Sequence, residues 1–381
     1  MDKDKILLVF DLAKRDGKTT VDFTKQLVEE LPPEIGNYTF LKELIIGGEI
    51  PSIPLKKYIH NPLKSLPSEI GKLVNLETLE VFKCELTDLP SEITRLFNLK
   101  ELNLLGNNFI ELPPVIGNLV SLKFLNLCLN PLTTLPPEIG NLINLESLWL
   151  CWNKLECLPS ELGRLIYLKE LRLDNNHLSS LPPEFGNLIN LQKDLHLENN
   201  YLSSLPNEIG NLKNVKYVTI NSNRLASLPP GIGKMENLKS LCIEKNKIRF
   251  LPQEIGDLKN LGWIEGHNNQ LEALPKEIGN LPSIRSLVFH HNSINHLPSE
   301  IGKLKTLNSL ILNNNKIQSL PPEIGNLQNL KILNLEKNPL TSLPIEMKNL
   351  KNLEELYLRG TSLESIPDEI KNLPKLEVLF F

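Results

Sequence analysis

The chain has 381 residues, of which 41% are hydrophobic and 23% are charged, and its formal net charge at pH 7 is −4. This small charge provides no electrostatic footprint for nucleic acid or for an anionic membrane surface. No apolar run approaches the ~20 residues that a membrane-spanning helix needs, and the N-terminal MDKDKILLVF is too acidic to resemble a secretory signal.

The first predicted element is a helix within residues 1–19. Ile6, Phe10 and Ala13 recur at helical spacing, and Gly17 is a suitable C-terminal stop. The repeated part of the chain begins directly afterwards. We therefore expect this helix to cap the N-terminal end of the core that follows.

A leucine-and-asparagine pattern of about 23 residues recurs through residues 20–381. One copy contains Leu125, Leu127 and Asn130, and the same residue types return in the next copy. A unit of this size cannot bury its own apolar face, so only stacking against its neighbours makes a core. The predicted fold class is α/β, an array of about 16 units in a curved horseshoe, with a parallel β-sheet on the concave face and short helical turns on the convex face.

Local patterns support this assignment. Apolar residues alternate with exposed ones across each predicted strand, as a strand with one buried face requires. The return segment, such as Leu135–Leu142, places proline and glutamate where a helix begins, and Gly140 disfavours a long helix. Because helices need more room than strands, the stack should curve.

An asparagine follows nearly every predicted strand, as at Asn107, Asn130 and Asn153. A buried amide carries both donors and an acceptor, so it can bridge the backbone of its own turn and of the next one. We expect these side chains to form a continuous ladder. Other residues take this position only near the ends of the array, at Gln26, Glu49, Cys84 and Thr361.

Two units depart from the period. About 12 extra residues lie within residues 47–61, either as a semi-ordered arm or as a degenerate repeat in which Ile53-Pro54 replaces a Leu-Pro step. One further residue is inserted near Lys193-Asp194, just before a strand. At the other end, Leu379–Phe381 leave an apolar edge with no predicted cap, which is a surface for self-association.

The cysteines bear on the cellular compartment. They are Cys84, Cys128, Cys151, Cys157 and Cys242, and they lack the paired clusters that close the ends of extracellular repeat arrays. We therefore expect reduced thiols and a cytoplasmic location. One glycosylation-type sequence, Asn37-Tyr38-Thr39, favours the opposite compartment.

Exposed strand positions of the N-terminal half carry large apolar side chains, which predicts an interaction site. The predicted binding residues are Phe82, Leu105, Phe124, Leu129, Trp149 and Trp152, with Cys128 and Cys151 between them and Arg172 and Asp174 as a polar rim. The alternative is that loops cover these side chains, or that the two tryptophans only pack on one another.

A second candidate surface lies further along the chain. It contains Trp263, His267, His290 and His291, with Glu244 and Glu265 nearby. His267 and His290 occupy equivalent positions on adjacent strands, so they could converge on a metal or form a pH-sensitive contact. Nothing forces a third or fourth ligand into place, so we predict no metal here and a polar binding face or plain solvated surface.

The chain lacks the signature of an enzyme. Gly17-Lys18-Thr19-Thr20 resembles the end of a phosphate-binding loop, but Leu12 stands where such a loop needs glycine. The repeated glutamates occupy one structural slot and are not an acid–base pair. We predict no catalytic residues and no cofactor.

The repeated unit, LPxEIGxLxxLxxLxLxxNxLxxLP, resembles the leucine-rich repeat superfamily over nearly the whole chain, and within it the intracellular Ras-group type. The resemblance implies a scaffold that binds another protein on its concave face, in small-GTPase or other intracellular signalling. A small GTPase, a phosphatase subunit and a host protein all fit as partners. The alternative is a recognition module, or fragment, of a larger multidomain signalling or effector protein.

Overall fold

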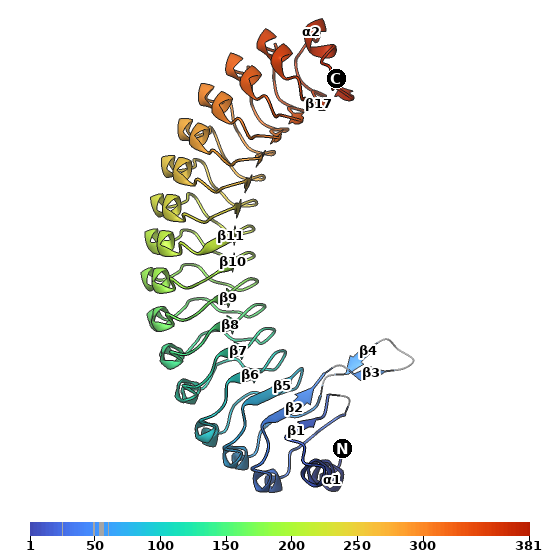
Figure 1. The fold of residues 1–381 in the computed structure, drawn as a ribbon, viewed down its shortest axis with the longest axis vertical. Coiled ribbons are helices and arrows are strands. Elements are labelled where there is room, and N and C mark those ends of the chain that lie inside the picture. Colours follow the sequence, from blue (N-terminus) through green and yellow to red (C-terminus); the bar gives the residue numbers. More distant parts are fainter. Residues whose placement is uncertain (25, 49, 53–56, 60) are drawn as a thin grey trace. The chain divides into compact units, whose positions relative to one another are not determined.

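The computed structural model describes residues 1–24, 26–48, 50–52, 57–59 and 61–381. The chain forms two compact units, Met1–Leu191 and Gln192–Phe381. Each unit is a solenoid with parallel strands on its concave face and short helices on its convex face (Figure 1). The predicted fold class is confirmed.

The strands follow one another in sequence order within each unit. The first unit contains β1 (Thr20–Asp22), β2 (Glu43–Gly47), β5 (Thr78–Phe82), β6 (Glu101–Asn103), β7 (Phe124–Asn126), β8 (Ser147–Trp149) and β9 (Glu170–Arg172). The second contains β10 (Lys193–His196), β11 (Val215–Thr219), β12 (Ser240–Cys242), β13 (Trp263–Glu265), β14 (Ser286–Val288), β15 (Ser309–Ile311), β16 (Ile332–Asn334), β17 (Glu355–Tyr357) and β18 (Val378–Phe380). Equivalent positions of neighbouring repeats pair, as Leu125 does with Leu148, so each buried leucine stacks on the next.

The convex face consists of 3-10 helices of five residues each. In the first unit they are η1 (Pro33–Asn37), η2 (Ser68–Lys72), η3 (Ser91–Arg95), η4 (Pro114–Asn118), η5 (Pro137–Asn141), η6 (Ser160–Arg164) and η7 (Pro183–Asn187). In the second they are η8 (Asn207–Asn211), η9 (Pro230–Lys234), η10 (Gln253–Asp257), η11 (Lys276–Asn280), η12 (Ser299–Lys303), η13 (Pro322–Asn326) and η14 (Ile345–Asn349), followed by the α-helix α2 (Asp368–Lys371). None of these helices, nor any other in the described residues, has the length and hydrophobicity that crossing a bilayer requires.

The glycine of the helical segment has a second role that the sequence did not reveal. A Cβ atom built on Gly140 would lie 2.4 Å from the carbonyl oxygen of Glu161 in the next helix. Real Cβ atoms do not come so close, because the two atoms would overlap. Glycine therefore allows neighbouring helices to pack closely, in addition to keeping each one short.

The asparagine ladder is present, and its direction is clear. Asn153 is buried, and its amide donates to the carbonyl oxygens of Leu150, in its own repeat, and of Leu127, in the preceding repeat, at 3.0 and 2.9 Å. Its Oδ1 accepts a hydrogen bond from the backbone N–H of Leu132, also in the preceding repeat, at 3.2 Å. Each asparagine therefore completes the repeat before it, and the expectation that it bridges to the next one is corrected.

Two predicted departures from the ladder keep part of its bonding. The thiol of Cys84 lies 3.5 Å from the carbonyl oxygen of Phe82, and the hydroxyl of Thr361 donates to Leu358 at 2.8 Å. Glu49 lies outside the described residues. The buried Asn61 occupies the corresponding ladder position, because it donates to the carbonyl oxygen of Gln26 at 2.9 Å.

The two irregular units have different structures. Within the insertion, β3 (Ile50–Ser52) and β4 (Lys57–Ile59) form an antiparallel pair that projects from the sheet as a hairpin, so this segment is no further repeat (Figure 1). The Ile53-Pro54 step on which that alternative rested lies outside the described residues. The single extra residue at Lys193-Asp194 produces a register shift in the pairing of β10 with β11.

The N-terminal segment forms the α-helix α1 (Lys3–Arg15), and its residues Ile6, Phe10 and Ala13 are buried. Asp2 caps the helix by accepting a hydrogen bond from the backbone N–H of Lys5 at 3.0 Å. The ring of Phe10 stacks on Tyr38, with centroids 4.9 Å apart. The apolar face of α1 thus packs against the first repeat.

Candidate functional site

Aromatic side chains gather on the concave face of the first unit. Phe124 and Trp149 meet edge to face with ring centroids 5.1 Å apart, and the guanidinium carbon of Arg172 lies 5.8 Å from the Trp149 ring. Strands β7, β8 and β9 hold the three side chains in neighbouring repeats. We call Phe124, Leu129, Trp149, Trp152 and Arg172 the aromatic cluster.

Leu129 and Trp152 project from the turns that follow strands β7 and β8. Each has a left-handed backbone, with φ of 58° and 56°, and their side chains are 50% and 57% exposed. In the other repeats where the residue at this position has a left-handed backbone, that residue is glycine, asparagine, serine, lysine or histidine. A left-handed backbone costs an L-residue roughly 1–2 kcal/mol. The fold does not require bulky apolar residues in these turns.

A disulfide bond joins Cys128 to Cys151, directly before Leu129 and Trp152. The two cysteines occupy equivalent positions of adjacent repeats, with Cα atoms 4.6 Å apart, and both are buried. The expectation of five reduced thiols is therefore corrected for this pair. The bond ties together the two turns that expose the large side chains, which limits how far they can move apart.

Three polar atoms in the same region are buried and have no hydrogen-bond partner among the described residues. They are Nε1 of Trp149, Nε of Arg172 and Oδ1 of Asp174. The last two form an ion pair at 3.7 Å, which is too long for a hydrogen bond. Buried polar groups normally have partners. A bound ligand with a donor and acceptors would supply them here.

The structure places the other predicted residues of this surface less favourably. Phe82 and Leu105 are only half-exposed, and Trp149 is half-buried against Phe124. Asp174 is 5% exposed, so it does not form the solvated rim that the sequence predicted. Side chains two residues apart in a strand do point to the same face, as predicted. Side chains at equivalent positions of neighbouring repeats, however, pack against one another and bury part of each other's surface.

The second candidate surface lies on the second unit. Trp263 is 45% exposed on strand β13, His291 is exposed in the turn after β14, and His267 and His290 are half-buried. The rings of His267 and His290 stack with centroids 4.4 Å apart, so the ring faces, and not the nitrogens, meet. Burial, and the neighbouring His267 and His291, lower the pKa of His290 to about 4. The imidazole is therefore neutral at physiological pH.

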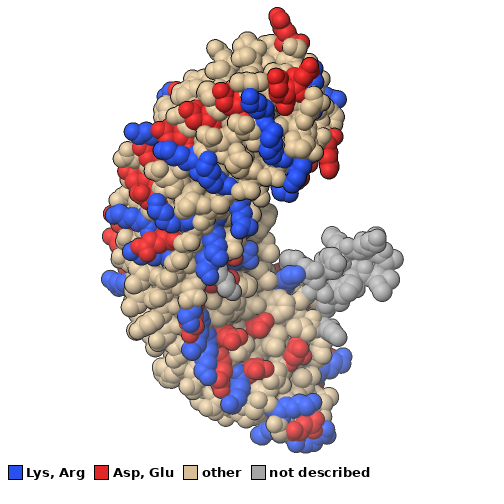
Figure 2. Space-filling model, turned by 45° about the horizontal axis from the view of Figure 1, so that its top comes forward, with Lys and Arg blue, Asp and Glu red and all other residues tan. Residues whose placement is uncertain are grey.

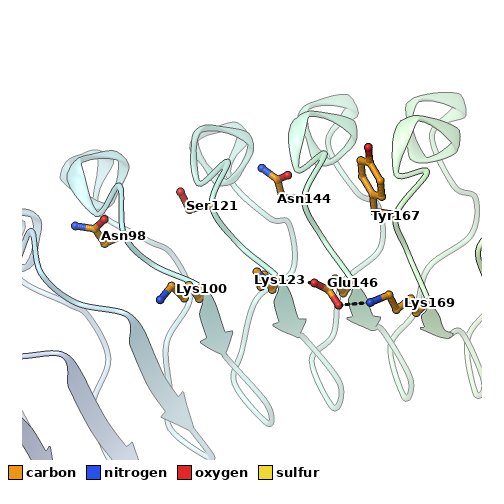
Figure 3. A pocket seen from close by; sticks show the side chains of 8 residues that line it. All are labelled: Asn98, Lys100, Ser121, Lys123, Asn144, Glu146, Tyr167 and Lys169. Carbon is orange, nitrogen blue, oxygen red and sulfur yellow. Dashed lines mark hydrogen bonds and ion pairs between the residues drawn. The ribbon is translucent and has the colours of Figure 1, made fainter.

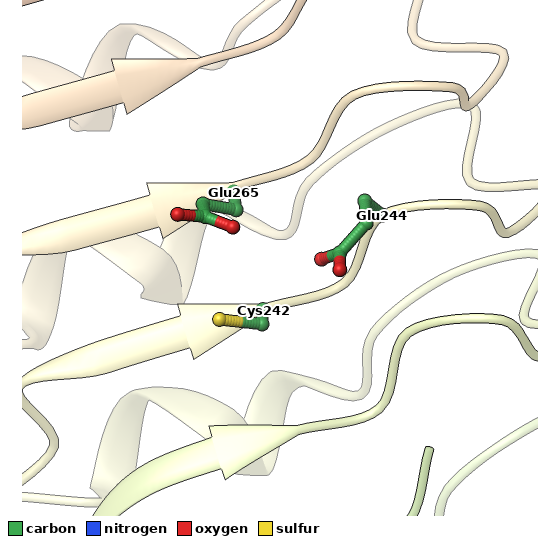
Figure 4. Close-up of side chains that lie close together, drawn as sticks. All are labelled: Cys242, Glu244 and Glu265. Atoms are coloured by element: carbon green, nitrogen blue, oxygen red, sulfur yellow. The ribbon is translucent and has the colours of Figure 1, made fainter. Parts of the chain in front are cut away.

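Cys242, Glu244 and Glu265 lie close together, on strands β12 and β13 and in the turn after β12 (Figure 4). One thiol or carboxylate atom from each lies within 4.8 Å of the others, the only such group of three or more potential ligands in the described part of the chain. Burial raises the pKa of Cys242 to about 11 and raises that of Glu244, with Glu265 adding to both effects. Cys242 is therefore a neutral thiol at neutral pH, and neither His267 nor His290 joins this group of three.

The disulfide predicts a distinctive thiol count. Protein purified without reductant and then denatured should show three thiols, those of Cys84, Cys157 and Cys242, and reduction should raise the count to five. In the native protein only the exposed Cys157 should react quickly, because burial raises the pKa of Cys84 to about 12. Titration with a chromogenic disulfide reagent measures all three values. Five thiols in the denatured, unreduced protein would show that Cys128 and Cys151 are not joined by a disulfide bond.

Comparison with known proteins matches this architecture. The family described as "Leucine-rich repeat region" matches residues 114–193, 184–290 and 263–381, and "Leucine Rich Repeat" matches residues 98–119. No curated protein shows significant similarity to the chain.

Several solved structures are similar. A leucine-rich repeat protein of Leptospira interrogans is 37% identical, with 94% of this chain and 95% of that chain covered and a TM-score of 0.66. The plant peptide hormone receptor RGFR1, solved in complex with RGF2, is 27% identical over 96% of this chain and 67% of that one, with a TM-score of 0.71. A chain of the Drosophila Toll–Spatzle complex is 25% identical with a TM-score of 0.76, and this chain spans only 48% of its length.

Proposed function

Since the chain belongs to the leucine-rich repeat family, a fold of protein-interaction modules, we propose that it binds a protein or peptide through the aromatic cluster of its first unit. The observation that carries the proposal is the exposure of Leu129 and Trp152 from left-handed turns. Tryptophan and arginine are preferred anchors of protein interfaces. The unpaired polar atoms beside Trp149 would then receive partners from the ligand.

Two observations support a ligand outside the cytosol. The disulfide between Cys128 and Cys151 is typical of oxidising compartments, and one similar structure is a receptor bound to a peptide hormone. The resemblance to the Ras-group type supports instead a small GTPase, or another intracellular signalling partner, in the cytoplasm. We favour the first because it rests on a specific bond. Either way, the chain can act alone or as the recognition part of a larger protein.

Affinity capture with paired variants tests the proposal. The intact chain and a Trp149→Ala, Trp152→Ala variant are compared as baits. Trp263→Ala is the control, because Trp263 is an exposed tryptophan on a strand of the other unit. We expect the double variant to lose the captured protein and the control to keep it, with isolated-pair affinities measured by calorimetry. A double variant that binds the same partner with the same affinity would overturn the proposal, and loss only in Trp263→Ala would move the site to the second unit.

Self-association through the C-terminal edge is a second candidate. Leu379, Phe380 and Phe381 are 36%, 37% and 56% exposed. Phe380 stacks on Tyr357 at 5.3 Å and lies 4.6 Å from the guanidinium of Arg359, so part of this edge is already covered. Sedimentation of the wild-type chain and a Phe381→Ser variant measures whether the remainder drives dimer formation.

A further inference from the structure

A row of exposed apolar side chains runs along one flank of the first unit, at the position that follows each of the 3-10 helices η2 to η7 and its capping leucine. Its members are Val74, Phe97, Val120, Ile143, Ile166 and Ile189, and their exposed fractions run from 42% to 67%. We call this row the apolar stripe. Six such side chains present on the order of 500 Å² of apolar surface, an extent that marks interaction sites on soluble proteins.

The fold does not need these side chains. In the second unit the equivalent positions hold Lys213, Glu236, Lys259, Pro282, Lys305, Gln328 and Lys351. The backbone at the stripe position has the same surroundings in the two units. In each unit a side chain of the following repeat donates to the carbonyl oxygen of the residue at that position. Asn144 donates to Val120 at 2.9 Å in the first unit, and Asn237 donates to Lys213 at 2.9 Å in the second. The apolar character of the stripe therefore has a reason other than folding.

These hydrogen bonds also hold the stripe in place. Asn98 donates to the carbonyl oxygen of Val74 at 2.9 Å, Ser121 to that of Phe97 at 2.6 Å, and Asn190 to that of Ile166 at 2.7 Å. Four of the six stripe residues, including Val120, are thus fixed through their own backbone. A fixed surface loses little conformational entropy when a partner binds to it.

A charged groove lies directly beside the stripe. It encloses about 490 Å³ and is lined by Asn98, Lys100, Ser121, Lys123, Asn144, Glu146, Tyr167 and Lys169 (Figure 3). One wall carries Ser121, Asn144 and Tyr167, each the next residue in the chain after a stripe residue. The stripe is therefore the outer lip of the groove. Figure 2 shows that much of the first unit's surface in that view carries no charged side chain.

The opposite wall belongs to a row of charges with an excess of lysine. In chain order the row is Lys42, Glu77, Lys100, Lys123, Glu146 and Lys169, and each backbone N–H donates to the carbonyl oxygen of the member before it. Glu77 pairs with Lys42 and Lys100, and Glu146 pairs with Lys123 and Lys169, at 2.5 to 3.4 Å. Each glutamate therefore holds two lysines, which leaves one positive charge in excess for every three residues.

We propose that the apolar stripe and this lysine-rich row together bind an amphipathic helix of another protein, whose apolar face is flanked by carboxylates. The stripe offers side chains, and the backbone carbonyl oxygens of four of its six residues already accept hydrogen bonds, so the suitable occupant is one that satisfies its own backbone, as a helix does. Five steps of at least about 4.8 Å make the stripe at least about 24 Å long. A helix of about 16 residues at 1.5 Å per residue covers that length.

A second copy of this chain does not fit the same surface. The row reads lysine, glutamate, lysine, lysine, glutamate, lysine in both directions. A twofold axis that crosses the row pairs the same surface with itself in the antiparallel sense, which would set lysine against lysine and glutamate against glutamate. An acidic helix avoids this repulsion.

Three synthetic 18-residue peptides test the proposal with the full chain. All have leucine at helical spacing, and the flanking positions carry glutamate in the first peptide, lysine in the second and a scrambled order in the third. Fluorescence anisotropy should show saturable binding of the glutamate peptide alone, and the affinity should fall as salt is added because exposed charges are screened.

Two sets of variants locate the binding. Phe97→Lys, Val120→Glu, Ile143→Lys copies the residue types of the second unit and should weaken binding at least about tenfold. The control, Phe250→Lys, Tyr217→Glu, Ile345→Lys, changes three exposed apolar or aromatic side chains of the second unit and should have no effect. Lys100→Glu, Lys123→Glu alters only exposed charges, so it folds normally and should bind the lysine peptide instead. The Trp149→Ala, Trp152→Ala variant should bind the glutamate peptide normally, which separates this surface from the aromatic cluster.

Specific outcomes would overturn the proposal. These are no binding of the glutamate peptide, equal binding of the glutamate and lysine peptides, or unchanged binding by the stripe variant in a protein whose melting curve is intact. Light scattering tests one further outcome that would overturn the proposal. If the wild type is a dimer and the stripe substitutions convert it to a monomer, the occupant of the stripe is a second copy of this chain.

Discussion

Replacing Asn153 with leucine is expected to lower the free energy of unfolding by about 3–5 kcal/mol, because it leaves the buried N–H of Leu132 unpaired at roughly 1–3 kcal/mol and removes two amide–carbonyl hydrogen bonds at about 1 kcal/mol each. The carbonyl oxygens of Leu127 and Leu150 lose the amide of Asn153 but keep those of Asn130 and Asn176, at 3.0 and 2.9 Å. The loss should appear as a lower urea midpoint. Amide hydrogen exchange should also become faster at Leu132, one repeat before the substitution.

Asn144 provides the matched control for this experiment. It also donates one side-chain hydrogen bond to the preceding repeat, to Val120 at 2.9 Å, but it is exposed. Asn144→Leu should therefore cost about 1 kcal/mol or less, since water can replace the lost bond. If the two variants lower the free energy of unfolding by the same amount, the buried ladder contributes no more to stability than an exposed hydrogen bond does.

Replacing Leu129 and Trp152 with asparagine is expected to raise stability and to abolish partner binding at the same time. Asparagine tolerates the left-handed backbone, and Asn175 occupies the equivalent position of the next repeat with φ of 56°. Relief of the strain should add roughly 1 kcal/mol for each site. Thermal melts measure the gain, and the capture assay measures the loss.

Alanine separates the two effects. Leu129→Ala, Trp152→Ala removes the same side chains but keeps a residue that disfavours a left-handed backbone. This variant should lose binding without gaining stability. If the asparagine variant melts at a lower temperature than the wild type, the two side chains stabilise the fold, and their strain would no longer indicate a binding role.

Much of the fold follows from the sequence because each repeat presents the same physical problem. The alternation around Leu125 and Leu127 correctly predicted strands with one buried face, and the recurring asparagine correctly predicted a buried hydrogen-bonded ladder. The helical spacing of Ile6 and Phe10 also correctly predicted the buried face of α1. Periodicity carried no such information about the hairpin formed by β3 and β4, which has no counterpart in any other repeat.

The candidate sites were harder to predict. Cys128 and Cys151 stand at the same position of adjacent repeats, so the register of the strands already brings them close together. The sequence prediction used the cysteines only to infer the cellular compartment, and it did not consider that these two could form a disulfide bond. The apolar stripe was also present in the sequence, and in four of its six repeats it immediately precedes an asparagine, at Asn75, Asn98, Asn144 and Asn190. It lies outside the strands, so the alternation of side chains within the strands does not indicate it. The burial of Asp174 depends on packing between columns, which no single repeat reveals.

The backward direction of the asparagine bonds also bears on how the protein is made. During synthesis, repeats leave the ribosome in order, and one buried N–H of each repeat is satisfied only when its successor arrives, as the N–H of Leu132 waits for Asn153. The newest repeat is thus always the incomplete one, and all those before it are closed. Growth of the nascent chain and completion of the native structure proceed in the same direction, so a pause in translation leaves at most one unfinished turn exposed to misfolding or proteolysis.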